Sequence, residues 1–184
     1  MKDGDILRVE KLKVWFPVKK GVFARTVGFV KAVDGVSFEL HRGEILGFAG
    51  LVGCGRTETA QLICGAKPIE SGELLVNGKK AKLHSPVDAI GLGIGLIPED
   101  RKEQGCILYN SVLFNTTLIC NDKYMSGGVI RRRKQAKVAQ EYKDNLRIKV
   151  PSLQQQVVNL SGGNQQKVVV AKTMAADLDI IFFD

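Results

Sequence analysis

Two segments near the start of the chain alternate apolar and polar residues, which is the pattern of a strand with one buried face. They are residues 6–10 and 36–40, and a period of two places successive side chains on opposite faces of a sheet. Residues 17–28 mix glycine with basic side chains, which predicts a loop. Residues 1–43 are therefore expected to form an antiparallel β region.

Three short apolar runs further along the chain lack this alternation. Residues 44–49 are bounded by glycine, residues 94–97 stop at Pro98, and residues 180–184 end on an acid. Continuous apolar runs of this length are typical of strands buried on both faces, as in a parallel sheet. A further strand, at residues 72–78, is predicted to enter a tight Asn-Gly turn.

Helical periodicity is found between these runs. Apolar residues recur at every fourth position within residues 131–148, which predicts a helix with one buried face. Helices are also predicted at residues 56–64 and 165–176. A succession of strand, loop, helix and strand indicates the α/β class, with helices packed on a parallel sheet. Residues 105–159 would then form an inserted helical lobe.

Composition excludes several other classes of protein. Hydrophobic residues make up 45% and charged residues 25% of the 184, and no stretch approaches the roughly 18 unbroken apolar residues of a membrane helix. The N-terminus has no apolar core after a basic start, so we expect no signal peptide and a cytoplasmic protein. Four cysteines without C-x-x-C spacing and only two histidines argue against a zinc site.

The net charge of +8 raises the question of nucleic-acid binding. The densest basic run, residues 131–134, opens a predicted helix and has no interleaved aromatic residues on which bases could stack. A solvated helix face is therefore expected, with no nucleic-acid partner.

Residues 50–57 fit the phosphate-binding pattern G-x-x-x-x-G-K-[ST] at every position but one. Glycines let backbone amides curl around phosphates, and the helix that follows directs its positive dipole end at the same anion. Thr57 offers a hydroxyl to Mg²⁺. The alternative is a purely structural role, in which residues 50–57 form a glycine-rich turn between strand and helix and bind no ligand.

Arg56 stands where this pattern expects lysine. A guanidinium keeps the positive charge, but it is planar and wide and favours two parallel hydrogen bonds. A lost charge-assisted contact would cost about 1.5–3 kcal/mol. We therefore expect ATP binding to survive at this loop and hydrolysis to be impaired.

A second motif, LSGGNQQK, occupies residues 160–167. By itself it predicts a helix whose N-cap is Ser161. It also resembles the LSGGQ signature of ABC ATPases in a longer form, and residues 180–184 resemble the Walker B strand of that family. Together with residues 50–58 and the IPEDRK segment at 97–102, the motif resembles the second of two ABC domains in the ATPase subunits of ribose-, galactose- and xylose-type sugar importers.

The resemblance implies a P-loop NTPase fold of the α/β class, an ABC nucleotide-binding domain with a parallel core sheet. Residues 44–104 and 160–184 would form the core, with an N-terminal antiparallel β subdomain at 1–43 and an inserted helical subdomain at 105–159. The family's catalytic glutamate and switch histidine would follow Asp184. The chain is therefore expected to be a single, C-terminally truncated domain of low stability and little ATPase activity.

The resemblance also assigns roles to individual residues. Phe16 lies where the family places its adenine-stacking aromatic residue, with Trp15 as the neighbouring candidate, although a core aromatic would suit the same position. The residues expected to hold the phosphates of ATP are Gly50, Gly53, Cys54, Gly55, Arg56 and Thr57.

Two acids are the candidate catalytic and metal-binding groups. Asp184 corresponds to the Walker B aspartate, which holds Mg²⁺ through water, and Glu99 takes the position of the Q-loop glutamine. An ionised carboxylate can ligate Mg²⁺ but cannot donate a hydrogen bond. A surface ion pair of Glu99 with Arg101 or Lys102 is the alternative.

The signature residues imply a partner. In the family Ser161, Gly162 and Gly163 contact the γ-phosphate of ATP held by the opposite domain of a head-to-tail dimer, so a second ABC domain, fused or separate, is expected. Transmembrane permease subunits, and a solute-binding protein acting through them, would complete an importer at the cytoplasmic face of the membrane.

The solute and the mode of action stay open in the sequence. The first 35 residues look more like peptide-importer ATPases than sugar importers, so peptide and nucleoside uptake are alternatives to sugar uptake. Arg56 also allows a mainly regulatory half-site that does not hydrolyse ATP. A soluble ABC protein acting on ribosomes or DNA is a third class, against which the IPEDRK and LSGGNQQK segments argue.

Overall fold

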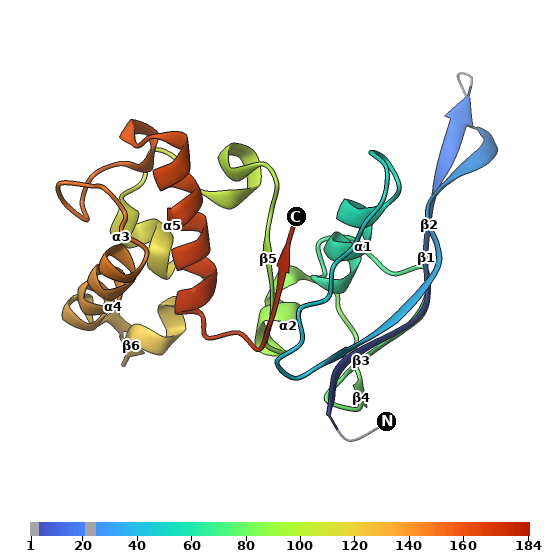
Figure 1. Ribbon diagram of the computed structural model, residues 1–184, viewed down its shortest axis with the longest axis horizontal. Helices are drawn as coiled ribbons and strands as arrows, with labels where there is room; N and C mark the ends of the chain where they lie inside the picture. The colour runs from blue at the N-terminus through green and yellow to red at the C-terminus, as the bar shows by residue number, and fades with distance from the viewer. Residues whose placement is uncertain (1–3, 21–24) are drawn as a thin grey trace. The chain divides into compact units, whose positions relative to one another are not determined.

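The computed structural model describes residues 4–20 and 25–184 (Figure 1). The chain divides into two compact units, Met1–Leu92 and Gly93–Asp184. None of the helices in the described part of the chain is both long and apolar enough to cross a membrane.

The first unit is built on a four-stranded antiparallel sheet in the order β2-β1-β3-β4. The strands are β1 (Asp5–Lys20), β2 (Arg25–His41), β3 (Ser71–Val76) and β4 (Lys79–Lys80). Figure 1 shows β1 and β2 as one long twisted ribbon. The prediction of an antiparallel β region at the start of the chain is thus confirmed.

The predicted loop over residues 17–28 was wrong for most of its length. β1 continues to Lys20 and β2 begins at Arg25, and these two residues pair with each other. Glycine and basic residues indicated a loop, but cross-strand pairing satisfies the backbone N–H and C=O groups wherever two extended segments run side by side. Basic side chains are also common on the exposed edges of sheets.

Two short helices accompany this sheet. They are α1 (Arg56–Ile63) and α2 (Pro86–Gly91), the latter opened by a capping box between Ser85 and Asp88. The large side chains that are fully buried in this unit come from β1, β3 and α1. They include Leu7, Val9, Leu12, Leu62, Ile63 and Leu74.

The strand predicted at residues 44–49 is not formed. Ile45 is 99% exposed, and in the described part of the chain no strand pairs with this segment. The edge of the Phe48 ring meets Phe38, with 5.0 Å between the ring centroids. A continuous apolar run indicates burial by neighbours on both faces, but it forms a strand only where another strand accepts its hydrogen bonds.

The second unit contains a parallel strand pair and three α-helices. β5 (Ile94–Ile97) pairs with β8 (Ile180–Phe183), as the sequence predicts for a parallel sheet. The helices are α3 (Val112–Thr117), α4 (Arg132–Asn145) and α5 (Gly162–Ala175). All three pack against one another (Figure 1).

Shorter elements connect these helices. A π-helical turn spans Arg101–Gly105, and 3-10 helices span Leu118–Tyr124 and Val157–Asn159. A small hairpin joins β6 (Met125–Ser126) to β7 (Val129–Ile130) just before α4.

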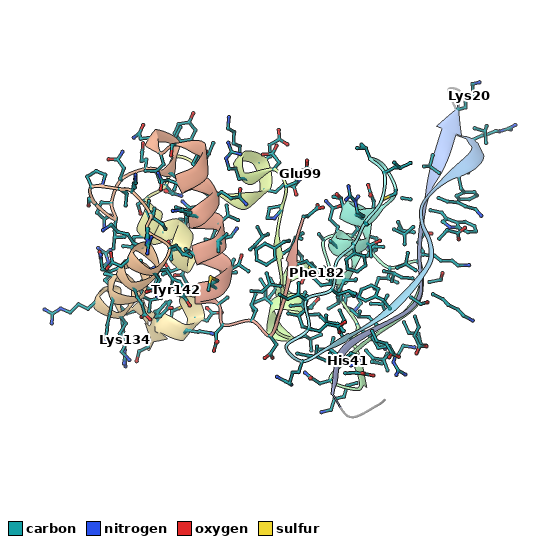
Figure 2. The ribbon with its side chains drawn as sticks, viewed as in Figure 1. Lys20, His41, Glu99, Lys134, Tyr142 and Phe182 are labelled. Atoms are coloured by element: carbon teal, nitrogen blue, oxygen red, sulfur yellow. The ribbon has the colours of Figure 1, made fainter. Side chains whose placement is uncertain are left out.

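Two apolar clusters that include residues of α5 form part of the core of the second unit. One includes Val112, Val157 and Val168, and the other includes Cys120 and Ala175. The predicted buried face of the helix over residues 131–148 is confirmed, because its apolar side chains pack on these clusters. Tyr142, labelled in Figure 2, contacts both clusters and donates a 2.9 Å hydrogen bond to the carbonyl of Met174.

Candidate nucleotide-binding site

The glycine-rich loop at residues 50–57 has a curled backbone that depends on glycine, as its sequence predicts. Gly53 and Gly55 adopt φ angles of +81° and +88°, in the region that L-residues other than glycine rarely occupy. A Cβ on Gly55 would lie 2.2 Å from the carbonyl oxygen of Ala32, and one on Gly50 would lie 2.4 Å from the Cys54 sulfur. The loop therefore needs glycine at these positions for its backbone to close.

The loop leads directly into α1, as expected. Gly55 is the N-cap residue, and glycine has no side chain with which to cap the first turn. The first backbone amides of a helix lack intrahelical partners and carry the positive end of the helix dipole. Arg56 is exposed and Thr57 is partly buried at this end. The arrangement suits an anion bound by backbone amides.

The candidate aromatic residues lie on β1. The side chain of Phe16 is outside the described part of the chain. Trp15 is partly buried; its indole Nε1 donates to the Asp34 carboxylate at 3.3 Å, and the Lys31 ammonium lies 4.6 Å from its ring centroid. The hydrogen bond from Lys31 is the main cause that lowers the pKa of Asp34. One face of Trp15 is thus covered by a cation, which a stacked base would have to displace.

The two candidate acids come together in the second unit. β5 and β8 are parallel, so their carboxyl ends meet at one edge of the strand pair, and the amide of Asp184 donates to the carbonyl of Ile97 at 3.0 Å. Glu99, labelled in Figure 2, follows β5 by two residues, and both acids are exposed. Exposed carboxylates are ligands that suit Mg²⁺, a cation that keeps several of its waters.

A further cluster of acids and histidine was not predicted. Asp5, Glu39 and His41 lie where their oxygen and nitrogen atoms are all within 4.8 Å of one another. Arg8 contacts the Asp5 carboxylate at 3.2 Å and that of Glu39 at 2.7 Å, while His41 Nδ1 lies 2.7 Å from Asp5. The Arg8 guanidinium already supplies the positive charge that a metal would bring, so the cluster is an ion-pair network that joins β1 to β2.

The signature segment opens α5, three residues before the predicted start of that helix. Ser161 occupies the N-cap position, but the predicted capping bond from its side chain is not formed. Its hydroxyl oxygen instead accepts a 2.9 Å hydrogen bond from the Asn164 side-chain amide. Ser161 and Gly163 are exposed, and a Cβ on Gly163 would meet nothing within 4 Å. The tip of the motif is therefore open to a ligand.

The later residues of the motif hold the helix in place. The Asn164 side-chain oxygen accepts from the backbone amide of Lys149 at 2.9 Å, and the Lys167 ammonium donates to the carbonyl of Arg147 at 3.1 Å. Both contacts join α5 to the segment that follows α4. Sequence reasoning missed these roles, because the partners lie 15 and 20 residues away along the chain.

Comparison with known proteins agrees with this arrangement. The model of the ABC transporter family matches residues 33–184. A ribose/galactose/methyl galactoside import ATP-binding protein of Halalkalibacterium halodurans is 47% identical over 151 residues, which are 82% of this chain and 29% of that protein. The xylose import ATP-binding protein of Thermoanaerobacter pseudethanolicus is 43% identical over 174 residues, 94% of this chain and 34% of that protein.

Solved structures support the same fold. A dimeric ATP-binding cassette in a post-hydrolysis state with ADP and Pi matches with a TM-score of 0.79 at 20% identity, over 97% of this chain and 73% of that chain. This likeness confirms the predicted fold of a nucleotide-binding cassette. The chain spans only 29% and 34% of the length of the two curated relatives named above. On the family match and these identities, the chain belongs to the ABC transporter family.

Proposed function

We propose that the chain is an ATP-binding cassette that couples ATP binding and hydrolysis to the import of a sugar or a related small solute. The observation that carries the proposal is that the chain contains both elements of such a site. One is a loop with glycines at positive φ before α1, and the other, in the second unit, is a helix N-terminus at which Ser161 and Gly163 are exposed. The names of its relatives, which are sugar import ATP-binding proteins, direct the choice of solute.

In this proposal the loop binds the phosphates of ATP. The backbone amides around Gly53 and Gly55 would point at the β- and γ-phosphates, with the dipole of α1 favouring the negative charge. Mg²⁺ would be held by Thr57, Glu99 and Asp184. When bound, the ion would neutralise charge on the transferring phosphoryl group.

The signature residues would act on a second nucleotide. Ser161, Gly162 and Gly163 would contact the γ-phosphate of ATP held by another cassette in a head-to-tail dimer. Closure of that dimer would drive transmembrane permease subunits, fed by a solute-binding protein, at the cytoplasmic face of the membrane. The hydrogen bond from the Asn164 side-chain amide uses the Ser161 hydroxyl oxygen as acceptor and not its proton. This supports the role, because the proton can then be donated to a phosphate oxygen.

Arg56 would limit the rate of ATP hydrolysis at the cassette's own loop. We infer that this site binds ATP but hydrolyses it slowly, because a planar guanidinium cannot reproduce the point charge of lysine at the γ-phosphate. The exposure of Arg56 supports a side chain that faces the ligand and not the core. A mainly regulatory role for this half-site follows if the partner's site does the hydrolysis.

The test uses the complete protein, assembled with its permease in proteoliposomes. We expect Arg56→Lys to raise ATP turnover and to leave the Kd for ATP within a few-fold of its original value. Arg132→Lys, an equally conservative change at an exposed position on α4, is the control and should change neither quantity. Unchanged turnover in Arg56→Lys would refute the account of a slow site.

Uptake of labelled solutes tests the import itself. Ribose, galactose and xylose are the expected solutes, and a dipeptide and a nucleoside are included because the start of the chain differs from sugar importers. ATP-dependent uptake of a sugar supports the proposal. Failure of the chain to bind ATP, or uptake of only the peptide or the nucleoside, would contradict it.

A further inference from the structure

The Arg101 side chain lies against the N-terminal turn of the signature helix. Its Nε donates to the Gln165 side-chain oxygen at 3.3 Å, and a Cβ on Gly162 would lie 2.9 Å from its Nη2. Gln165 is buried, and its amide nitrogen donates to the carbonyl of Val157 at 3.1 Å. Arg101 therefore contacts the helix start through a glutamine that is itself fixed.

The turn that carries Arg101 is attached along α5 at two further levels. A Cβ on Gly105 would lie 2.8 Å from a methyl carbon of Val169, so the turn packs closely on the helix there. The Lys172 ammonium donates to the Gly105 carbonyl at 2.6 Å, and burial lowers the pKa of this lysine. The turn and α5 are thus held together at the start, middle and later part of the helix.

The turn is also stiff within itself. The Asp100 carboxylate accepts from the amides of Lys102 and Glu103 at 2.8 and 3.1 Å, and the amide of Cys106 donates to the Arg101 carbonyl at 2.9 Å. Hydrogen bonds of this i→i+5 type are rare and often occur at functional sites. A stiff turn transmits a displacement of its first residue to the residues that it contacts.

Charge attraction does not explain why Arg101 lies where it does. A helix N-terminus carries partial positive charge, so a cation beside it is disfavoured. The hydrogen-bond acceptor that Arg101 contacts there is the neutral Gln165, so no carboxylate offsets the repulsion in that bond. The contact serves to hold two segments in register, and Gly162 leaves the room that the guanidinium needs.

We propose that Arg101 is a positioning residue for the signature motif. It fixes Ser161 and Gly163 to the segment that begins at Glu99, so that this segment and the start of α5 move as one body. The inference rests on the proposed function, in which these residues meet the γ-phosphate of ATP held by a second cassette. Arg101 then governs the partner cassette's site and leaves ATP binding at residues 50–57 of its own chain unaltered.

Arg101→Ala in the complete protein, assembled with its partner cassette and permease, tests this role. We expect ATP turnover to fall about tenfold or more, because a hydrogen bond from a charged group is lost. The Kd for ATP at the cassette's own loop should stay within twofold of the parent value. An effect on kcat is thereby distinguished from an effect on ATP binding. Lys102→Ala, an exposed neighbour on the same turn, is the matched control and should keep normal turnover.

Gln165→Leu removes the same link from the other side and serves if Arg101→Ala does not fold. If the link is the cause, the double variant should lose no more turnover than the more impaired single variant. Additive losses, or wild-type turnover in Arg101→Ala, would overturn the inference while the proposed function stands. A protein that binds no ATP at all would instead refute the proposed function.

Discussion

Gly55→Ala is the sharpest test of the geometry of the glycine-rich loop at residues 50–57. Gly55 is buried, adopts a φ of +88° and directs its missing Cβ at the carbonyl oxygen of Ala32, only 2.2 Å away. Ala32 belongs to β2, and its neighbours on that strand pair with β1. Its carbonyl therefore cannot withdraw without disturbing the pairing of the hairpin.

Gly53→Ala supplies the matched control for the size of the effect. Gly53 has nearly the same φ, +81°, but a Cβ there would meet nothing within 4 Å. In each variant, forcing alanine into the left-handed backbone conformation should lower the free energy of unfolding by about 1–2 kcal/mol. In each variant, about 0.4–1 kcal/mol of stability should be regained, because alanine restricts the unfolded chain more than glycine does. These contributions cancel in the comparison, and the clash at Gly55 remains, at about 1–3 kcal/mol.

Urea unfolding of the two variants and the parent protein measures this difference. We expect Gly55→Ala to be less stable than Gly53→Ala by about 1–3 kcal/mol, with an unchanged dependence on urea concentration. Equal losses in the two variants would refute the reasoning, because they would show that the Ala32 carbonyl yields without cost.

Two further predictions concern the first unit. Leu62 is fully buried on α1, so Leu62→Ala should lower the free energy of unfolding by about 2–5 kcal/mol, measured in urea. A loss smaller than that of Leu51→Ala, a control at an exposed position, would contradict this prediction. The hydrogen bond from the His84 amide, followed by that from the Ser85 side chain, lowers the pKa of Asp88 below its usual range. The unfolded state therefore binds more protons, and the stability that Asp88 contributes is lost as the pH falls through the lowered pKa of the folded state. Asp88→Asn should therefore lower the thermal midpoint at neutral pH and match the parent in strong acid, and a gap that persists in acid would exclude this carboxylate as its cause.

Local signals predicted much of the fold and of the candidate site. The glycines at positions 53 and 55 were predictable, because a tight turn before a helix requires a positive φ that glycine adopts without steric cost. Short apolar runs predicted the parallel strands β5 and β8. Apolar residues at every fourth position predicted the helix Arg132–Asn145. In each case the residues that make the pattern are also those that form the element.

The sequence alone was therefore enough to predict the glycine-rich loop before α1 and the family of the protein, because the residues of each motif are neighbours in the chain. Only the tertiary structure decided what lies beside them. The run at 44–49 forms no strand, since no strand among residues 4–20 and 25–184 pairs with it. Arg101 contacts Gln165, which lies 64 positions further along the sequence. Pairing and contact over such separations depend on where the chain returns, and no local periodicity encodes that.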